Sequence, residues 1–371
     1  MKIVFLTHSY WKYLMGGTEY QVSLLARELT EREHEVHYIF INSTSSEVPE
    51  RDDRIFLHPV KNRGISRLIG EVAYRNEILK LLRQIKPDCI YHRNLSLFLS
   101  FANTYCRHND CRTIWHIACK PDVETRRLSV SKRILADYFE EKYLKSGIKH
   151  ADCIVGQEDY HNQILFRNFG RKCTVILNKL LPVERKQIAK TLPMKVLWIA
   201  NIKPFKQAEL FIDLAHHFTE DKSISFVMVG RPTRGNYQLE LEKRMQGVNN
   251  LEYKGELSIE KVNDLLRESH LFVNTSLYEG GPPNTFIQAW MRETPTVSLN
   301  VDPDDVIEKN KLGFHSGAFE QMVKDVRFLI ENKKVRQEMG RNARKYAIEE
   351  YDINKIVPTY IKLFESLSNR K

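Results

Sequence analysis

The sequence lacks several features that would mark a well-defined class of protein. None of its six cysteines forms a Cys-x-x-Cys pair, which argues against a dithiol redox motif and favours free thiols. No stretch approaches the roughly 18 consecutive apolar residues that a membrane-spanning helix needs. Residues Met1–Leu6 contain only four consecutive apolar residues, which indicates a strand rather than a signal peptide. We therefore expect a cytoplasmic protein.

The composition is that of an ordinary globular protein, with 42% hydrophobic and 28% charged residues. A chain of 371 residues is long enough for two domains, each with its own core. Of the net charge of +10, residues 1–193 carry +9, from 31 Lys and Arg against 22 Asp and Glu. This excess predicts that the first half meets something anionic.

Two stretches, Arg63–Lys86 and Lys120–Lys149, carry most of the basic excess. The second has amphipathic helical spacing with a basic rim, which is compatible with peripheral docking on an anionic membrane surface. The more frequent explanation of such a stretch is a solvated face on a core-packed helix. No nucleic-acid recognition motif accompanies the charge, so we expect no nucleic-acid partner.

Apolar runs alternate with helix-length amphipathic stretches, a pattern typical of βαβ units and parallel sheets. In the first half the pattern predicts strands over Lys2–Thr7, Glu35–Ile41, Cys89–His92, Arg112–Ile117, Cys153–Gly156 and Thr174–Leu177, and helices over Glu19–Glu31 and Glu71–Gln84. In the second half it predicts strands over Lys195–Ala200, Ser225–Val229, Leu251–Tyr253, Leu271–Asn274 and Thr296–Leu299, and helices over Gln207–His217, Ser258–Ser269, Thr285–Arg292 and Asp352–Ser368.

These elements predict an α/β protein with two Rossmann-like, doubly wound parallel-sheet domains facing across a cleft. The pattern breaks in a polar stretch with two prolines, which is typical of a linker. We assign residues 1–185 to the first, acceptor-side domain, 186–193 to the linker and 194–351 to the second domain. Residues 352–371 would form a helix that crosses back to the first domain. Such sheets bind ligands at the carboxyl ends of their strands.

The segment Leu277–Trp290 carries the strongest functional signal. It contains one acid, Glu279, before a turn with Gly280 and Gly281, and a helix is then expected to open with Asn284 at its N-cap. Free backbone N–H groups at a helix start, reached through a loop with few side chains, favour an anion. A carboxylate beside a phosphate is suited to accept hydrogen bonds from hydroxyls attached to that phosphate. The segment therefore predicts a nucleotide-sugar site, with an ordinary strand–turn–helix connection as the alternative.

This segment resembles the signature of the retaining, GT-B-fold glycosyltransferases of family 4, also called glycosyl transferases group 1. Glu279 and Gly280 match the first acid of that signature and the glycine after it, and Asn284 and Thr285 match the helix opening. The sequence departs from the family in two ways. The loop is one residue longer, and Gln288 occupies the place of a second glutamate. Glutamine can donate to and accept from hydroxyls, so the resemblance implies that Gln288 contacts the ribose.

Glycines Gly16 and Gly17 lie in the loop after the first strand. Thr18 is expected to start the next helix, with Gln21 as its capping-box partner. Such glycines let the backbone approach a phosphate or sugar, although a plain flexible loop would look the same. The loop lacks Gly-x-Gly-x-x-Gly, which disfavours a nicotinamide dehydrogenase. The resemblance further implies that His116, at the end of a strand, contacts the donor sugar, although a lone histidine is more often structural.

The resemblance also covers the opening of the second half, where Lys206 matches a lysine of the family. Asn201 stands where the family has arginine, so Lys203 would supply part of the missing charge. Cations here would hold the diphosphate and neutralise charge on the leaving group. Further strand ends would shape the pocket for the nucleotide base, at Gly230, Arg231, Gly255 and Leu257.

Together these observations predict a retaining glycosyltransferase. It would move a sugar from a nucleotide-diphosphate sugar to a hydroxyl on a glycan or lipid-linked acceptor, in surface-polysaccharide or glycolipid assembly. We assign catalytic roles to Glu279, His116 and Lys206. The resemblance implies that no metal or other cofactor is needed, because basic side chains and helix N-termini hold the diphosphate.

Two alternatives remain open. Asn201 and Gln288 indicate a non-catalytic nucleotide-sugar-binding subunit with the same fold. A nucleotide-sugar 2-epimerase would need acids and histidines clustered for proton transfer, and the residues expected to face the cleft include few of them.

Overall fold

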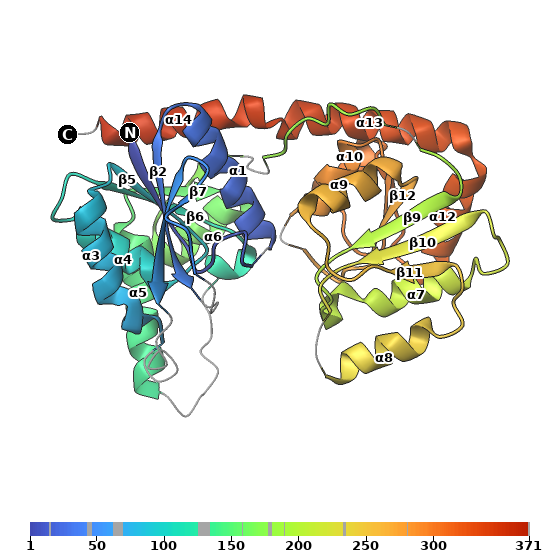
Figure 1. The fold of residues 1–371 in the computed structure, drawn as a ribbon, viewed down its shortest axis with the longest axis horizontal. Helices are drawn as coiled ribbons and strands as arrows, with labels where there is room; N and C mark the ends of the chain where they lie inside the picture. The colour runs from blue at the N-terminus through green and yellow to red at the C-terminus, as the bar shows by residue number, and fades with distance from the viewer. Residues whose placement is uncertain are drawn as a thin grey trace. The chain divides into compact units, whose positions relative to one another are not determined.

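The computed structural model describes residues 1–14, 16–42, 47–61, 70–124, 134–157, 159–176, 180–188, 190–232, 235–279 and 281–369. The chain divides into two compact units, one of Met1–Leu180 with Ile353–Lys371 and one of Leu181–Asp352. Each unit is a largely parallel sheet with helices on both faces (Figure 1). The predicted α/β class with two parallel-sheet domains is thereby confirmed.

The sheet of the first unit has the strand order β3-β4-β2-β1-β5-β6-β7-β8, and its described pairs are parallel except β3 with β4. Its strands are β1 (Lys2–Leu6), β2 (Glu35–Asn42), β3 (Arg51–Asp52), β4 (Ile55–Lys61), β5 (Cys89–Arg93), β6 (Arg112–His116), β7 (Cys153–Gly156) and β8 (Thr174–Val175). Residues Ile3 to Leu6 of β1 are all fully buried. Such a run without polar alternation is expected where helices cover both faces of a parallel sheet.

The helices of the first unit are α1 (Gly17–Glu31), η1 (Gly70–Tyr74), α3 (Arg75–Ile85), α4 (Leu97–Cys106), η2 (Lys120–Asp122), α5 (Ile134–His150), α6 (Asp159–Phe169) and α14 (Ile353–Ser368). The apolar sides of α3 and α4 share one core with Val4 and Leu6 of β1. On the opposite face, α14 reaches β5, where the rings of Phe364 and Tyr91 lie 6.3 Å apart. The last helix therefore completes the first unit (Figure 1).

Strand β4 and helix α4 are among the elements of the first unit that were not predicted, and each has a physical reason. Strand β4 contains Pro59, which usually argues against a paired strand. It is tolerated because the outer neighbour β3 pairs only with Ile55 and Phe56. Helix α4 is buried over most of its length because it packs on β6 and also against α5. It therefore lacks the polar face that would reveal a helical period.

The sheet of the second unit is entirely parallel in its described pairs, with the order β11-β10-β9-β12-β13-β14. The strands are β9 (Met194–Ile199), β10 (Ile224–Val229), β11 (Leu251–Tyr253), β12 (Leu271–Asn274), β13 (Thr296–Ser298) and β14 (Gly313–His315). The helices are η3 (Pro204–Lys206), α7 (Ala208–His216), α8 (Asn236–Met245), α9 (Ile259–Glu268), α10 (Asn284–Trp290), η4 (Pro303–Asp305), α11 (Val306–Lys309), α12 (Phe319–Glu331) and α13 (Lys333–Tyr351).

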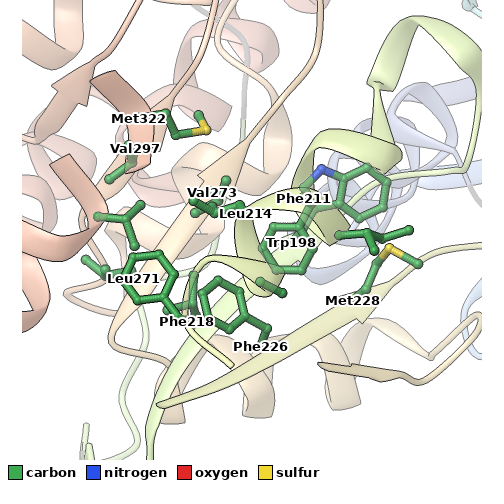
Figure 2. Close-up of a cluster of buried hydrophobic side chains, with 14 of the residues drawn as sticks. Trp198, Phe211, Leu214, Phe218, Phe226, Met228, Leu271, Val273, Val297 and Met322 are labelled. Carbon is green, nitrogen blue, oxygen red and sulfur yellow. The ribbon is translucent and has the colours of Figure 1, made fainter. Parts of the chain in front are cut away.

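A large apolar core fills one face of this second sheet. Figure 2 shows Trp198 of β9 and Phe226 of β10 meeting Phe211 of α7, with Met322 of α12 at the far side of the cluster. Helices α7 and α8 lie on this face, and α9 and α10 lie on the other (Figure 1). The two ends of the unit meet in a parallel bridge between Leu181 and Asp352.

Three predicted helix starts are wrong in detail. The helix expected from Glu71 opens as the 3₁₀ helix η1, and α3 begins only at Arg75. Helix α1 has Gly16 as its N-cap residue and no side-chain cap, because glycine has no side chain. The amide of Gln21, the predicted capping-box partner, is used elsewhere. Its Nε2 donates to the Leu180 carbonyl at 3.1 Å and its Oε1 accepts from the Leu180 N–H at 2.7 Å. In α10 the N-cap residue is Pro283, and Asn284 is the first helical residue. None of the described helices combines the length and the apolar character needed to cross a membrane.

Candidate active site

Lys206 and Glu279 are brought together by two adjacent strands of the second sheet. β9 and β12 are neighbours, so the loops that leave their carboxyl ends lie side by side. The ammonium of Lys206, at the end of η3, forms an ion pair with Glu279 Oε1. The two side chains are only 16% and 15% exposed, so water screens their charges less than it would on an open surface.

A set of hydrogen bonds ties these two loops to each other. The Trp198 indole donates to Thr275 Oγ1 at 2.9 Å, and Thr275 Oγ1 donates to the Lys206 carbonyl at 2.8 Å. Next along the chain, Ser276 Oγ donates to Glu279 Oε1 at 2.8 Å. The Glu279 carboxylate is therefore oriented by two partners before any ligand arrives, which reduces the ordering cost of binding.

An aromatic pair borders the ion pair, and sequence reasoning missed it. The rings of Phe205 and Tyr278 stack at 5.0 Å with an interplanar angle of 12°. Lys206 Nζ lies 5.0 Å from the Phe205 ring centroid, within cation–π range. Tyr278 is 64% exposed, so an aromatic face stands open beside the charged groups. The available signal was the position of each ring, immediately before Lys206 in one loop and before Glu279 in the other.

The glycine at the end of β10 has a steric role. A Cβ at Gly230 would lie 1.8 Å from the Ala200 carbonyl oxygen, so only glycine allows β10 to approach the loop after β9 this closely. The Gly230 N–H donates to the Gly255 carbonyl at 2.9 Å, and the Ile202 N–H donates to the Arg231 carbonyl at 3.1 Å. The ends of β9, β10 and β11 are thus joined through backbone atoms.

Side chains next to these strand ends are also paired. The Arg231 guanidinium binds the Glu256 carboxylate in bidentate fashion, at 2.9 and 2.6 Å. Hydrogen bonding to Arg231 holds the pKa of Glu256 below its usual value. Leu257, two residues beyond Gly255, is half-buried. Gly255, with φ of +65°, has the left-handed backbone that glycine adopts readily.

The remaining predicted residues of the second unit differ in their surroundings. Asn201 and Lys203 are exposed, and Lys203 Nζ lies 6.0 Å from the Phe205 ring. Gly281 has φ of +95°, Asn284 and Thr285 are half-buried, and Gly280 lies outside the described residues. Gln288 is only 3% exposed, and its amide donates to Asn263 Oδ1 of α9 at 3.2 Å. In this structure the Gln288 side chain is therefore held against α9.

In the first unit, Gly16 and Gly17 lie at the start of α1, and His116 lies at the end of β6. His116 is fully buried, and its Nδ1 is hydrogen-bonded to the Tyr91 hydroxyl. The Tyr360 ring of α14 lies 6.1 Å away. Burial, together with nearby Arg93 and His161, holds the pKa of His116 well below its usual value, so the imidazole is neutral at pH 7.

Two further features bear on the predicted partners. Over the part of the chain that the structure describes, no three His, Cys, Asp or Glu side chains are grouped so that they could hold a metal ion. Within the basic stretch at 120–149, residues 125–133 lie outside the described residues. Of its later members, Lys142 and Lys145 are exposed on α5, and Lys145 pairs with Glu141.

The fold is that of the GT-B type, with two parallel-sheet α/β units, and an ion pair lies at the carboxyl edge of the second sheet. The profile described as "Glycosyltransferase Family 4" matches residues 15–178, and the profile "Glycosyl transferases group 1" matches residues 182–346. The chain belongs to the GT-B-fold glycosyltransferases of family 4.

Two relatives are similar in sequence. A poly(ribitol-phosphate) alpha-N-acetylglucosaminyltransferase of Staphylococcus aureus is 27% identical over 176 residues, which span 45% of this chain and 34% of that enzyme. This chain therefore matches only about a third of the length of that relative. An uncharacterized glycosyltransferase of Methanocaldococcus jannaschii is 22% identical over 388 aligned positions, which span 96% of each chain.

Solved structures share the fold at low sequence identity. Sucrose-phosphate synthase of Thermosynechococcus elongatus has a TM-score of 0.75 at 12% identity over 99% of both chains. HepE of Anabaena in complex with UDP has a TM-score of 0.73 at 15% identity, over 99% of this chain and all of that one. A TarM variant of S. aureus in complex with Fondaparinux, alpha-GlcNAc-glycerol and UDP has a TM-score of 0.73 at 14% identity, over 98% of this chain and 99% of that one.

Proposed function

We propose that the chain is a retaining glycosyltransferase that uses a nucleotide-diphosphate sugar as donor and a hydroxyl of a glycan or lipid-linked molecule as acceptor. The observation that carries this proposal is the Lys206–Glu279 ion pair, pre-oriented by Ser276. A cation and a carboxylate side by side match the two chemical parts of a nucleotide sugar, its diphosphate and its sugar hydroxyls.

In the proposed reaction, Lys206 exchanges its carboxylate partner for diphosphate oxygens, and Glu279 accepts hydrogen bonds from the sugar. The bond between the anomeric carbon and the phosphate oxygen breaks as the acceptor oxygen bonds to that carbon from the same face, and the acceptor hydroxyl gives its proton to the departing phosphate oxygen. The charge that develops on the departing nucleoside diphosphate lies beside Lys206, which lowers the barrier electrostatically. The loop at Gly16 and Gly17 and the strand ends at Gly230 and Gly255 belong to the proposal as substrate contacts, whereas His116 does not, because its side chain is fully buried.

What relatives bind supports this choice of substrates. HepE was solved with UDP, and the TarM variant with UDP and alpha-GlcNAc-glycerol. The S. aureus relative is named for the transfer of N-acetylglucosamine to poly(ribitol-phosphate). We therefore favour a role in assembling a surface polysaccharide or glycolipid, in the cytoplasm or at the inner face of the membrane and without a metal cofactor.

A donor screen without acceptor tests the proposal. The protein is mixed with a panel of nucleotide sugars, and thermal stabilisation is followed together with slow release of the nucleoside diphosphate. We expect one donor to stabilise the protein and to be hydrolysed slowly. If no nucleotide or nucleotide sugar stabilises it, the proposal is wrong.

The same donor then tests the two charged residues. We expect Glu279→Ala and Lys206→Ala each to lower turnover by about a hundredfold or more, the usual effect of removing a group that stabilises a transition state. Glu240→Ala is the matched control, because it removes one carboxylate from an exposed ion pair with Arg244 on α8. That variant should keep turnover within about twofold. Normal turnover in Glu279→Ala would refute the role of this residue.

One observation favours a second candidate, a non-catalytic subunit that binds nucleotide sugar. Gln288 stands at the place of a family glutamate, and its amide is held by Asn263 inside the unit. A protein of this kind would be stabilised by a donor in the screen but would release no diphosphate, even when supplied with a panel of hydroxyl acceptors. The donor would still stabilise such a protein only when Lys206 is present.

A further inference from the structure

A groove of about 260 Å³ opens on the first unit between α3 and α4. Its buried lining residues are Leu79 of α3 and Tyr105 of α4, which belong to the core that the two helices share. Arg75 and Arg83 line it from α3, and His108 lines it from the turn after α4. Figure 1 shows the two helices running side by side along one face of the first sheet.

The two arginines share one side of α3. Positions 75, 79 and 83 are spaced four residues apart, which places them one above another on a helix. The Cα atoms of Arg75 and Arg83 are separated by about 12 Å along the axis at 1.5 Å per residue. Leu79 lies between them and is 5% exposed, so the two arginines flank a buried leucine along the helix.

Every charged or polar side chain that lines the groove can donate a hydrogen bond. Besides Arg75, Arg83 and His108, the polar lining consists of Asn76, Thr104, Tyr105 and Asn109, and it includes no carboxylate. Among the ion pairs of the described residues, neither arginine has an acidic partner within 4.0 Å. A groove that is lined by two arginines and by no carboxylate favours an anionic ligand.

We propose that this groove binds a phosphoryl group, as a phosphate monoester or diester. Guanidinium groups recognise phosphate oxygens through paired N–H donors, and the amide and hydroxyl groups add neutral donors. The volume is below the roughly 300 to 1,000 Å³ of pockets for drug-sized ligands, so the groove fits a phosphate with a short polyol rather than a nucleotide sugar. The ligand is either a small phosphorylated molecule or the headgroup of an anionic lipid.

The groove is separate from the proposed donor site, which lies in the second unit. Its His108 end precedes β6, which begins at Arg112, so it lies toward the amino ends of the strands. The proposed catalytic groups lie at carboxyl ends instead. The groove also gives a structural role to part of the basic stretch Arg63–Lys86, which the proposed function leaves unexplained.

Two probes distinguish the two sources of phosphate. Glycerol 3-phosphate is titrated against the full-length protein and followed by ³¹P line broadening. Vesicles of phosphatidylcholine, with or without one quarter phosphatidylglycerol, are tested by co-sedimentation. Both experiments use a Lys206→Gln background, so that phosphate bound at the proposed donor site does not contribute.

We expect Arg75→Gln/Arg83→Gln to weaken binding of one of the two probes at least tenfold. Lys80→Gln/Lys149→Gln removes the same charge at two exposed positions outside the groove lining and should change binding by less than threefold. The single variant Arg83→Gln should show an intermediate loss, which guards against misfolding of the double variant. Loss with glycerol 3-phosphate indicates a small ligand, and loss with vesicles alone indicates a lipid headgroup. Equal binding by the two double variants, or no binding of either probe, would overturn the proposal.

Discussion

At the scale of single residues, the candidate site depends on what neighbouring groups do to each side chain. Glu279 is held by Lys206 and Ser276, whereas the amide of Gln288 is taken up by Asn263. His116 is buried beneath α14 and kept neutral. Residue type alone therefore does not decide whether a polar side chain can bind a ligand. A buried partner can either orient that side chain toward the ligand or take up its hydrogen-bonding groups.

Buried neutral histidines predict a pH dependence of stability. His92 Nδ1 donates to the Leu6 carbonyl at 2.7 Å, and its Nε2 is bonded to Ser96 Oγ at 3.1 Å. Burial lowers the pKa of His92 to about 4, from 6.5 in the unfolded chain. Between these values the unfolded state binds a proton that the folded state does not, so stability falls as pH falls.

We expect His92 to contribute an average loss of about 1 kcal/mol per pH unit in the free energy of unfolding between pH 6.5 and 5. Urea unfolding at pH 7, 6 and 5 measures the slope. In His92→Asn the slope should be smaller by about this amount, whatever the variant's stability at pH 7. An unchanged slope in that variant would show that His92 takes up its proton in the folded state as readily as in the unfolded one.

At the scale of elements, the loops after β9, β10 and β12 form the candidate site, and close backbone approach sets their positions. Gly230 is the tightest of these contacts, because β10 ends against the Ala200 carbonyl. Strand β4 and helix α4 show the same dependence on neighbours. One tolerates a proline because its partner β3 is short, and the other is buried on several sides.

Gly230→Ala should therefore disturb the second unit through sterics alone. We expect it to lower the free energy of unfolding by about 1–3 kcal/mol or more and to weaken donor stabilisation in the thermal-shift assay. Gly247→Ala is the comparison, since Gly247 has φ of +81° but no atom within 4 Å of its Cβ position. That change should cost about 1–2 kcal/mol and leave donor stabilisation intact. Equal effects of both on donor binding would contradict the steric role of Gly230.

At the scale of the whole molecule, each unit carries its own hydrophobic core. The first contains the segment of α14 around Phe364, although that helix lies at the end of the chain. The second is built around Trp198, Phe211 and Phe226 (Figure 2). A chain with two cores is expected to lose stability locally when one of them is damaged.

This organisation predicts where the effects of core mutations appear. We expect Phe364→Ala and Phe226→Ala each to cost about 3–5 kcal/mol. Hydrogen exchange followed by mass spectrometry should show lost protection in Met1–Leu180 for the first variant and in Leu181–Asp352 for the second. Loss of protection in both units from either substitution would show that the two cores unfold as one.

The sequence by itself determined the fold class, most strands and helices, and the family, because hydrophobic period and turn chemistry act over short stretches of chain. Strands Cys153–Gly156 and Leu271–Asn274 follow directly from their apolar runs. Only the tertiary structure decided which distant groups meet. Lys206 and Glu279 are 73 residues apart and touch because β9 lies beside β12. The partner of Gln288, the burial of His116 and the groove between α3 and α4 likewise depend on packing between elements, which no local pattern records.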